Sequence, residues 1–89
     1  MNTSAAAYGL TSAAELQRQH VAALLQQSYS WTRAASTVEP AVAQQVAPAL
    51  TVAAQLYEAQ QYPAALSQLA SVAAMVDQTR RAYPTLPGL

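Results

Sequence analysis

Side chains able to do acid–base or nucleophilic chemistry are few in this 89-residue chain, which has four arginines, four acidic residues, one histidine, no lysine and no cysteine. Histidine is the residue type that exchanges protons near neutral pH, so His20 is the only candidate general base. It stands one helical turn after Leu16 and one before Leu24, which favours a half-buried histidine bonded to a carbonyl or to water over a ligand or a proton shuttle. One histidine without cysteine does not make a tetrahedral zinc site within one chain.

Motifs that hold phosphate or build a catalytic triad are also missing. Glycine occurs only at Gly9 and Gly88, so the chain has no glycine-rich phosphate loop and no Gly-x-Ser-x-Gly turn. No acid–histidine–serine order stands out. We therefore predict a protein that is not an enzyme and that uses no cofactor or metal ion, and we infer no small-molecule substrate.

Five side chains are candidates for contact with a partner protein: Trp31, Tyr57, Tyr62, Arg80 and Arg81. Tryptophan and arginine dominate interface hot spots, but Trp31 can equally fill a helical core. The two tyrosines flank a predicted turn, and their side chains could either line a groove or pack in the core. The arginine pair can hold a carboxylate or phosphate, or complement the carbonyl end of a helix.

Helices must position these side chains, and the first is predicted over about residues 12–36. Ser12-Ala-Ala-Glu15 is a capping box, in which the serine hydroxyl and the glutamate side chain satisfy free amides at the start of a helix. A second capping signature, Ser36-Thr-Val-Glu39, precedes Pro40 and predicts a turn near residues 36–40. Apolar residues recur at helical spacing between the two signatures: Leu16, His20, Leu24, Trp31, Ala35 and Val38, widened by Val21 and Leu25.

Two further helices are predicted over about residues 38–60 and 63–82. Pro48 lies inside the second, where a proline costs about 3 kcal/mol, so we expect a kink or a break there. Gln60-Gln61-Tyr62-Pro63 predicts the next turn, and the proline after Tyr83 ends the third helix. The sequence thus predicts an all-α fold with three antiparallel helices in one domain spanning residues 1–89, with flexible tails at 1–11 and 84–89.

Composition limits the environment and the partners of the chain. The net charge is zero and basic residues form no stripe, which argues against nucleic-acid binding. The uncharged stretches 40–57 and 59–76 are mostly alanine and are interrupted by glutamine and proline, so we expect no membrane span. No basic residue precedes the Ala5-Ala6-Ala7 run, as it would in a signal peptide. The location is unknown, and intracellular only by default; export by a signal-less pathway stays open.

Low charge is the most informative feature of the composition. Charged residues make up 9% of the chain, against about 25% in typical soluble domains. Such a surface is poorly protected against association, so we expect much of it to be covered by a protein partner or a second copy. The leading hypothesis is a non-catalytic interaction module (an adaptor, chaperone-like protein or assembly subunit) that acts by helix–helix packing.

Two other classes of function remain open. One is a small secreted or virion structural hairpin, similar in size to the WXG100 proteins of type VII secretion. Those carry Trp-x-Gly in the turn, whereas Trp31-Thr32-Arg33 lacks the glycine. The other is an accessory subunit of an enzyme complex.

Residues 49–77 place small residues where two helices would cross and a tyrosine just before the second helix. This segment resembles one tetratricopeptide repeat, with Ala65 and Leu69 at the packing positions of the second helix and Tyr62 as the turn tyrosine. It departs from the family at the tryptophan, turn-glycine and closing-proline positions, which hold Ala49, Gln60 and Asp77. The resemblance implies an antiparallel pair of helices, and the tyrosines Tyr57 and Tyr62 make this hairpin the predicted partner-binding element. Five residues are expected to pack it: Val52, Ala53, Leu56, Ala65 and Leu69.

Overall fold

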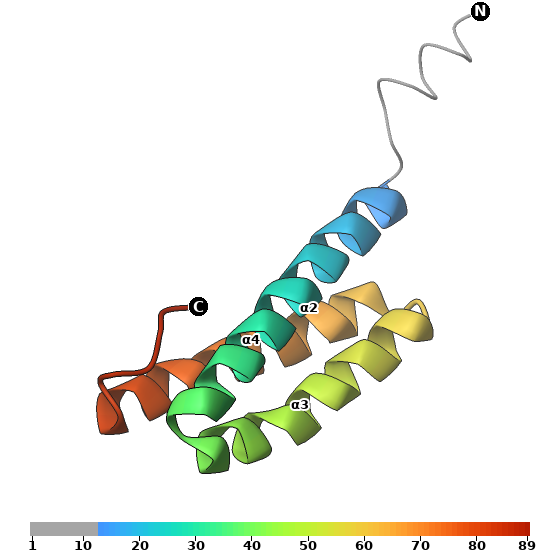
Figure 1. Cartoon of the computed structure of the whole chain (residues 1–89). Helices are drawn as coiled ribbons and strands as arrows, with labels where there is room; N and C mark the ends of the chain where they lie inside the picture. Colours follow the sequence, from blue (N-terminus) through green and yellow to red (C-terminus); the bar gives the residue numbers. More distant parts are fainter. Residues whose placement is uncertain (1–12) are drawn as a thin grey trace, which may run out of the picture.

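The computed structural model describes residues 13–89 and contains three helices, α2 (Ala13–Val38), α3 (Pro40–Glu58) and α4 (Tyr62–Ala82). Consecutive helices are antiparallel, and each of the three contacts the other two (Figure 1). Within the described residues there is no strand, so the predicted all-α, three-helix fold is confirmed. Ser12 and the predicted tail at residues 1–11 lie outside the described residues.

The turn between α2 and α3 is confirmed, but its predicted capping box is wrong. The Ser36 hydroxyl donates to the Arg33 carbonyl at 2.7 Å, so it turns back onto α2 instead of capping α3. Glu39 is the single non-helical residue between α2 and α3, with φ −149° and ψ 95°. Its side chain does not cap α3. A residue before proline is pushed toward extended backbone, and Pro40 then begins α3.

Helix α3 runs unbroken through Pro48, so of the two predicted outcomes, a kink or a break, the break does not occur. Proline at this position removes the N–H that would bond to the carbonyl of Gln44. Both residues are exposed, and water can therefore satisfy that carbonyl.

The turn between α3 and α4 is a Schellman motif centred on Gln60. The Gln60 amide donates to the Tyr57 carbonyl at 3.0 Å, and the Gln61 amide donates to the Leu56 carbonyl at 2.8 Å. Gln60 has a φ of 63°, the left-handed conformation that usually selects glycine. In the resemblance predicted from the sequence, this position corresponds to the turn glycine of a tetratricopeptide repeat.

The core consists of two clusters arranged along the helices. One lies toward the α2–α3 turn and contains Trp31, Ala35, Val42, Val46, Val72, Val76 and Leu86. The other lies toward the α3–α4 turn and contains Val21, Leu25, Leu50, Ala53, Ala65 and Leu69. Ala53, Ala65 and Leu69 pack the α3–α4 hairpin as expected, with Leu56 beside them, whereas Val52 is 43% exposed.

The buried stripe of α2 differs from the predicted one. It runs through Val21, Leu25, Ser28, Trp31 and Ala35, at steps of four, three, three and four residues. Leu16 and Val38, both assigned to the stripe from the sequence, are 55% and 46% exposed, and His20 is exposed too. Four of these five buried residues were in the predicted stripe, and only Ser28 was not. The buried face is therefore centred nearer to Val21 and Leu25 than predicted, with the lone histidine on the surface.

The segment after α4 packs on the bundle. Leu86 is 3% exposed and belongs to the same cluster as Trp31. The Trp31 indole N–H also donates to the Pro87 carbonyl at 2.7 Å. These contacts correct the prediction that residues 84–89 form a free, flexible tail.

Candidate protein-binding surface

Trp31 occupies the core of the molecule. Its side chain is 4% exposed and belongs to a cluster with residues of α3, α4 and the segment that follows α4. Its only polar atom is already bonded to Pro87. The structure thus shows the packing alternative for Trp31, and little of the side chain is available to a partner.

Tyr57 and Tyr62 form a half-buried pair beside the α3–α4 turn. Their ring centroids lie 5.9 Å apart with the ring planes at 54°, a tilted arrangement that aromatic pairs favour. Both rings pack on the cluster of Leu50 and Ala53. Packing therefore accounts for most of both rings, while their exposed edges remain at the surface.

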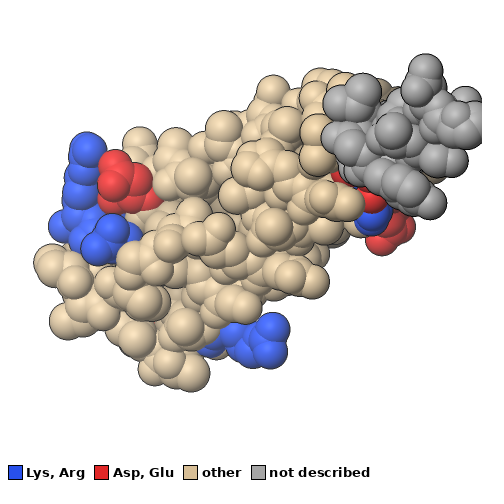
Figure 2. Space-filling model, turned by 90° about the horizontal axis from the view of Figure 1, so that it is seen from above, with Lys and Arg blue, Asp and Glu red and all other residues tan. Residues whose placement is uncertain are grey.

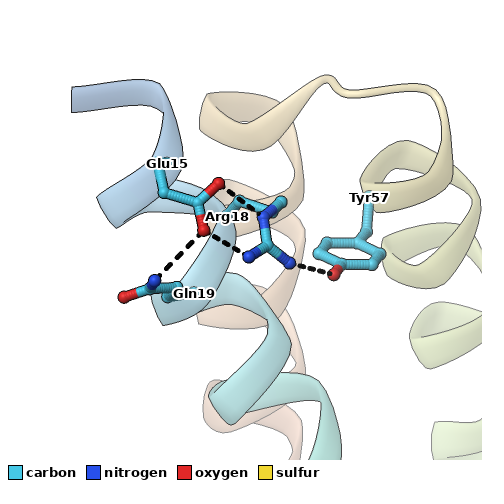
Figure 3. A network of polar contacts seen from close by, with 4 residues as sticks. All are labelled: Glu15, Arg18, Gln19 and Tyr57. Carbon is cyan, nitrogen blue, oxygen red and sulfur yellow. Dashed lines mark hydrogen bonds and ion pairs between the residues drawn. The ribbon is translucent and has the colours of Figure 1, made fainter. Parts of the chain in front are cut away.

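A polar network ties the first turns of α2 to the end of α3 (Figure 3). The Arg18 guanidinium pairs with the Glu15 carboxylate, donating from Nε to Oε1 at 2.9 Å, and reaches the Tyr57 hydroxyl at 3.5 Å. Gln19 donates to the same carboxylate at 3.1 Å. Hydrogen bonding to Arg18 lowers the pKa of Glu15, and the carboxylate in turn raises the pKa of Arg18.

The arginine pair lies at the far end of α4 from the tyrosines. Arg81 forms an exposed ion pair with Asp77 at 3.1 Å, a type of pair that contributes little to stability. The Arg80 guanidinium lies beside Gly88, where an added Cβ would come within 3.8 Å of Cζ. The structure consequently does not bring the five predicted contact residues together into one site.

A groove lies between α2 and α3. It has a volume of about 440 Å³ and is lined by Tyr29, Thr32, Arg33, Ser36, Ala43, Gln44 and Ala47. The residues contributed by each helix recur at three- and four-residue spacing, as the exposed edge of a helix pair does. That spacing was visible in the sequence, but without the true phase of α2 it did not identify a groove.

Two polar side chains of this groove are bonded to the backbone of α2. Thr32 and Ser36 donate their hydroxyl hydrogens to carbonyls of α2 at 2.8 and 2.7 Å, and the surface that lines the groove is mostly apolar. Arg33 is different, because no carboxylate among residues 13–89 pairs with its guanidinium. The groove is thus apolar with one available cation.

The second hollow lies between α2 and α4 and has a volume of about 290 Å³. Its walls are largely aliphatic, with His20 and Gln27 on the α2 side: His20, Leu24, Gln27, Ser28, Leu66, Leu69, Ala70, Ala73 and Leu89. No group of three or more His, Cys, Asp or Glu residues in the described part of the chain is arranged to hold a metal ion.

Charged side chains lie at the margins of one face of the molecule. Figure 2 shows them at both ends and along one edge of a face that is otherwise uncharged. Within the described residues, no helix has the length and hydrophobicity needed to cross a bilayer. The surface between the charged margins is therefore available for uncharged contacts.

No family model, curated protein or solved structure matches this chain. The resemblance of residues 49–77 to a tetratricopeptide repeat accordingly stays a prediction.

Proposed function

We propose that the protein is a non-catalytic interaction module that binds a helix of a partner protein in the groove between α2 and α3. The proposal rests on the apolar lining of this groove. Ala43 and Ala47 form one wall, and small side chains allow a second helix to approach closely. Tyr29 lines the groove and is 43% exposed, and tyrosine is common in interface cores.

The chemistry of the groove describes the helix it would accept. An amphipathic helix lays its apolar face into such a groove with anchors at positions i, i+3, i+4 and i+7. Arg33 adds one requirement, a carboxylate near the edge of that face, because a guanidinium forms its strongest bonds with carboxylates. The proposed partner therefore presents a small aliphatic helix face with one Asp or Glu.

The test compares two alanine-to-glutamate variants in capture experiments with lysate of the native source. Ala47→Glu places a charge on the exposed wall of the groove, whereas Ala74→Glu places the same charge on an exposed position of α4 that lines neither groove. Both positions lie in helices, where glutamate is well tolerated. We expect a partner that wild type and Ala74→Glu retain equally and that Ala47→Glu loses by at least about tenfold. Equal retention by both variants, or no retained protein at all, contradicts the proposal.

Reversal of the groove charge tests the proposed carboxylate. Arg33→Glu should reduce affinity for the same partner by about tenfold, and the loss should shrink at high salt because it is electrostatic. If Ala47→Glu abolishes binding and Arg33→Glu leaves it unchanged, the groove is the docking site but the partner has no acidic residue there.

A further inference from the structure

Residues 83–89 leave the end of α4 and turn back across the bundle (Figure 1). The Leu86 amide donates to the Tyr83 carbonyl at 3.0 Å, closing a turn with Pro84 at its second position, where proline is favoured. The Leu86 side chain then enters the cluster of Trp31, Val72 and Val76 and is 3% exposed. A single side chain thus anchors this segment in the core.

Beyond Leu86, α2 holds the segment through its backbone. Trp31 donates to the Pro87 carbonyl at 2.7 Å, and Gln27 donates to the Leu89 carbonyl at 3.1 Å. Trp31 and Gln27 are four residues apart, so they stand about 6 Å apart on one face of the helix. Carbonyls two residues apart on an extended chain are separated by about 6.6 Å, and the two spacings match. The two bonds thus hold alternate carbonyls at the spacing that an extended peptide presents, and the core cluster around Leu86, here called the Leu86 pocket, supplies side-chain selectivity.

The groove between α2 and α4 continues from Trp31 and Gln27 along α2 toward the start of that helix. It extends from Gln27 past Leu24 to His20, and residues 85–89 contribute to it only Leu89. His20 precedes Gln27 by two helical turns, roughly 10 Å, which an extended peptide covers in about three residues. The groove is therefore positioned to accept apolar side chains that follow the position of Leu89.

We propose that the α2–α4 face is a peptide-binding site that the chain's own residues 85–89 occupy in cis. Its ligand in trans is an extended segment of a partner protein, with a leucine in the Leu86 pocket and apolar residues continuing along the α2–α4 groove. This site involves different helix faces from the α2–α3 groove and does not depend on the function proposed above.

Competition with the cis segment explains why the ligand must be longer. A tethered segment acts at an effective concentration of about millimolar, so a peptide that reproduces only residues 85–89 competes poorly. A peptide that continues into the groove gains apolar contacts that the cis segment does not make. Each additional buried leucine is worth about tenfold or more in affinity, which is enough to displace the cis segment.

The experiment uses the full chain and two synthetic peptides. One has the sequence of residues 83–89, Tyr-Pro-Thr-Leu-Pro-Gly-Leu, and the other adds Ala-Leu-Ala-Leu after it. Binding is measured by fluorescence anisotropy of labelled peptide, and the single indole N–H signal in a ¹H–¹⁵N spectrum reports on the Trp31 bond. Leu86→Asp removes the apolar anchor of the cis segment and vacates the site.

The longer peptide should bind wild type at least tenfold more tightly than the shorter one. The shorter peptide should bind Leu86→Asp at least tenfold more tightly than wild type and should return the indole signal to its wild-type position. Replacing the first leucine of either peptide by aspartate should abolish binding. Gln27→Ala should weaken binding several-fold, whereas Gln26→Ala, a neighbouring exposed glutamine, should not.

Three results would overturn the proposal: equal affinity for the two peptides, an indole signal that does not respond to peptide, or binding that survives loss of the first leucine. Formation of a dimer between Leu86→Asp and wild type, with no advantage for the longer peptide, would assign the site to a second copy instead. If Leu86→Asp loses helicity by circular dichroism, Leu86→Ala replaces it in the same measurements, since it empties the pocket without introducing a charge.

Discussion

Arg18 joins two parts of the chain that are distant in sequence. Its guanidinium bonds to Glu15 one turn earlier on α2 and reaches the hydroxyl of Tyr57 on α3. The carboxylate also lies in the first turn of α2, where negative charge is favoured by the helix dipole. The i, i+3 spacing of Glu15 and Arg18 was visible in the sequence, but the link to Tyr57 depends on how α2 and α3 pack.

The lowered pKa of Glu15 has a direct test. Because Arg18 favours the ionised carboxylate in the folded state, the pair stabilises the fold above the ordinary pKa of glutamate, and this stabilisation is lost as pH falls through the lowered pKa. Arg18→Gln should raise the Glu15 pKa back toward its ordinary value. Carbon-detected NMR titration of the Glu15 carboxyl measures both midpoints; identical midpoints in the two proteins would show that Arg18 is not the cause.

Two substitutions at Tyr57 separate packing from hydrogen bonding. Tyr57→Phe removes only an acceptor 3.5 Å from Arg18, so the free energy of unfolding should change by less than about 0.5 kcal/mol. Tyr57→Ala also loses the contact with Tyr62 and with the core cluster, and should lower that free energy by about 2–3 kcal/mol. Urea denaturation measures both. A near-neutral Tyr57→Ala would restore the view from the sequence that Tyr57 is a surface anchor for a partner.

At the level of the helices, the α3–α4 turn holds Gln60 in a backbone conformation that glutamine disfavours. Gln60 is left-handed at φ 63°, and a residue with a Cβ pays about 1–2 kcal/mol there. Gln60→Gly relieves this strain but gives the unfolded chain more freedom, so the free energy of unfolding should rise by about 0.5–1 kcal/mol. Exposed Gln55→Gly, in the interior of α3, is the matched control and should lower it by about 1 kcal/mol. Destabilisation by Gln60→Gly in denaturant titrations would contradict the turn geometry.

Helix number and turns were predictable from the sequence because prolines and polar clusters mark them locally. The centre of the buried face of α2 was not predictable from the sequence. Ala35 is fully buried while Leu16 is mostly exposed, so apolar character alone does not select the inward face of an alanine-rich helix. What selects it is fit against α3 and α4, since a small side chain allows the close approach that a leucine prevents.

The two grooves could not be predicted from the sequence for the same reason. Each groove is lined by residues of two helices, so the residue pattern of one helix does not reveal it. The packing of Leu86 was also hidden, because its partner Trp31 lies 55 residues earlier and nothing in the local Tyr83–Gly88 pattern indicates that contact. Trp31, Tyr57 and Tyr62 were predicted as partner contacts; the structure shows Trp31 in the core and the two tyrosines half-buried beside the α3–α4 turn.

For the molecule as a whole, small side chains make the core thin. The largest fully buried side chains are one leucine and four valines: Leu50, Val21, Val42, Val46 and Val72. A chain of this length buries only about 60–65% of the surface that it exposes when unfolded. Stability is therefore a small difference between large terms, and a single core position accounts for a considerable part of it.

The two core clusters should unfold together, because all three helices run through both of them. Leu50→Ala, in the cluster without the tryptophan, should lower the free energy of unfolding by about 2–5 kcal/mol, since Leu50 is 0% exposed. Leu16→Ala is the matched control; at 55% exposure it should change that free energy by less than about 0.5 kcal/mol. Urea titrations followed by circular dichroism at 222 nm, the helix signal, and by Trp31 fluorescence should give the same shifted midpoint for Leu50→Ala. If the fluorescence midpoint stays at its wild-type value while the helix signal shifts, the cluster around Trp31 is an independent unit, and the three helices do not form one cooperative core.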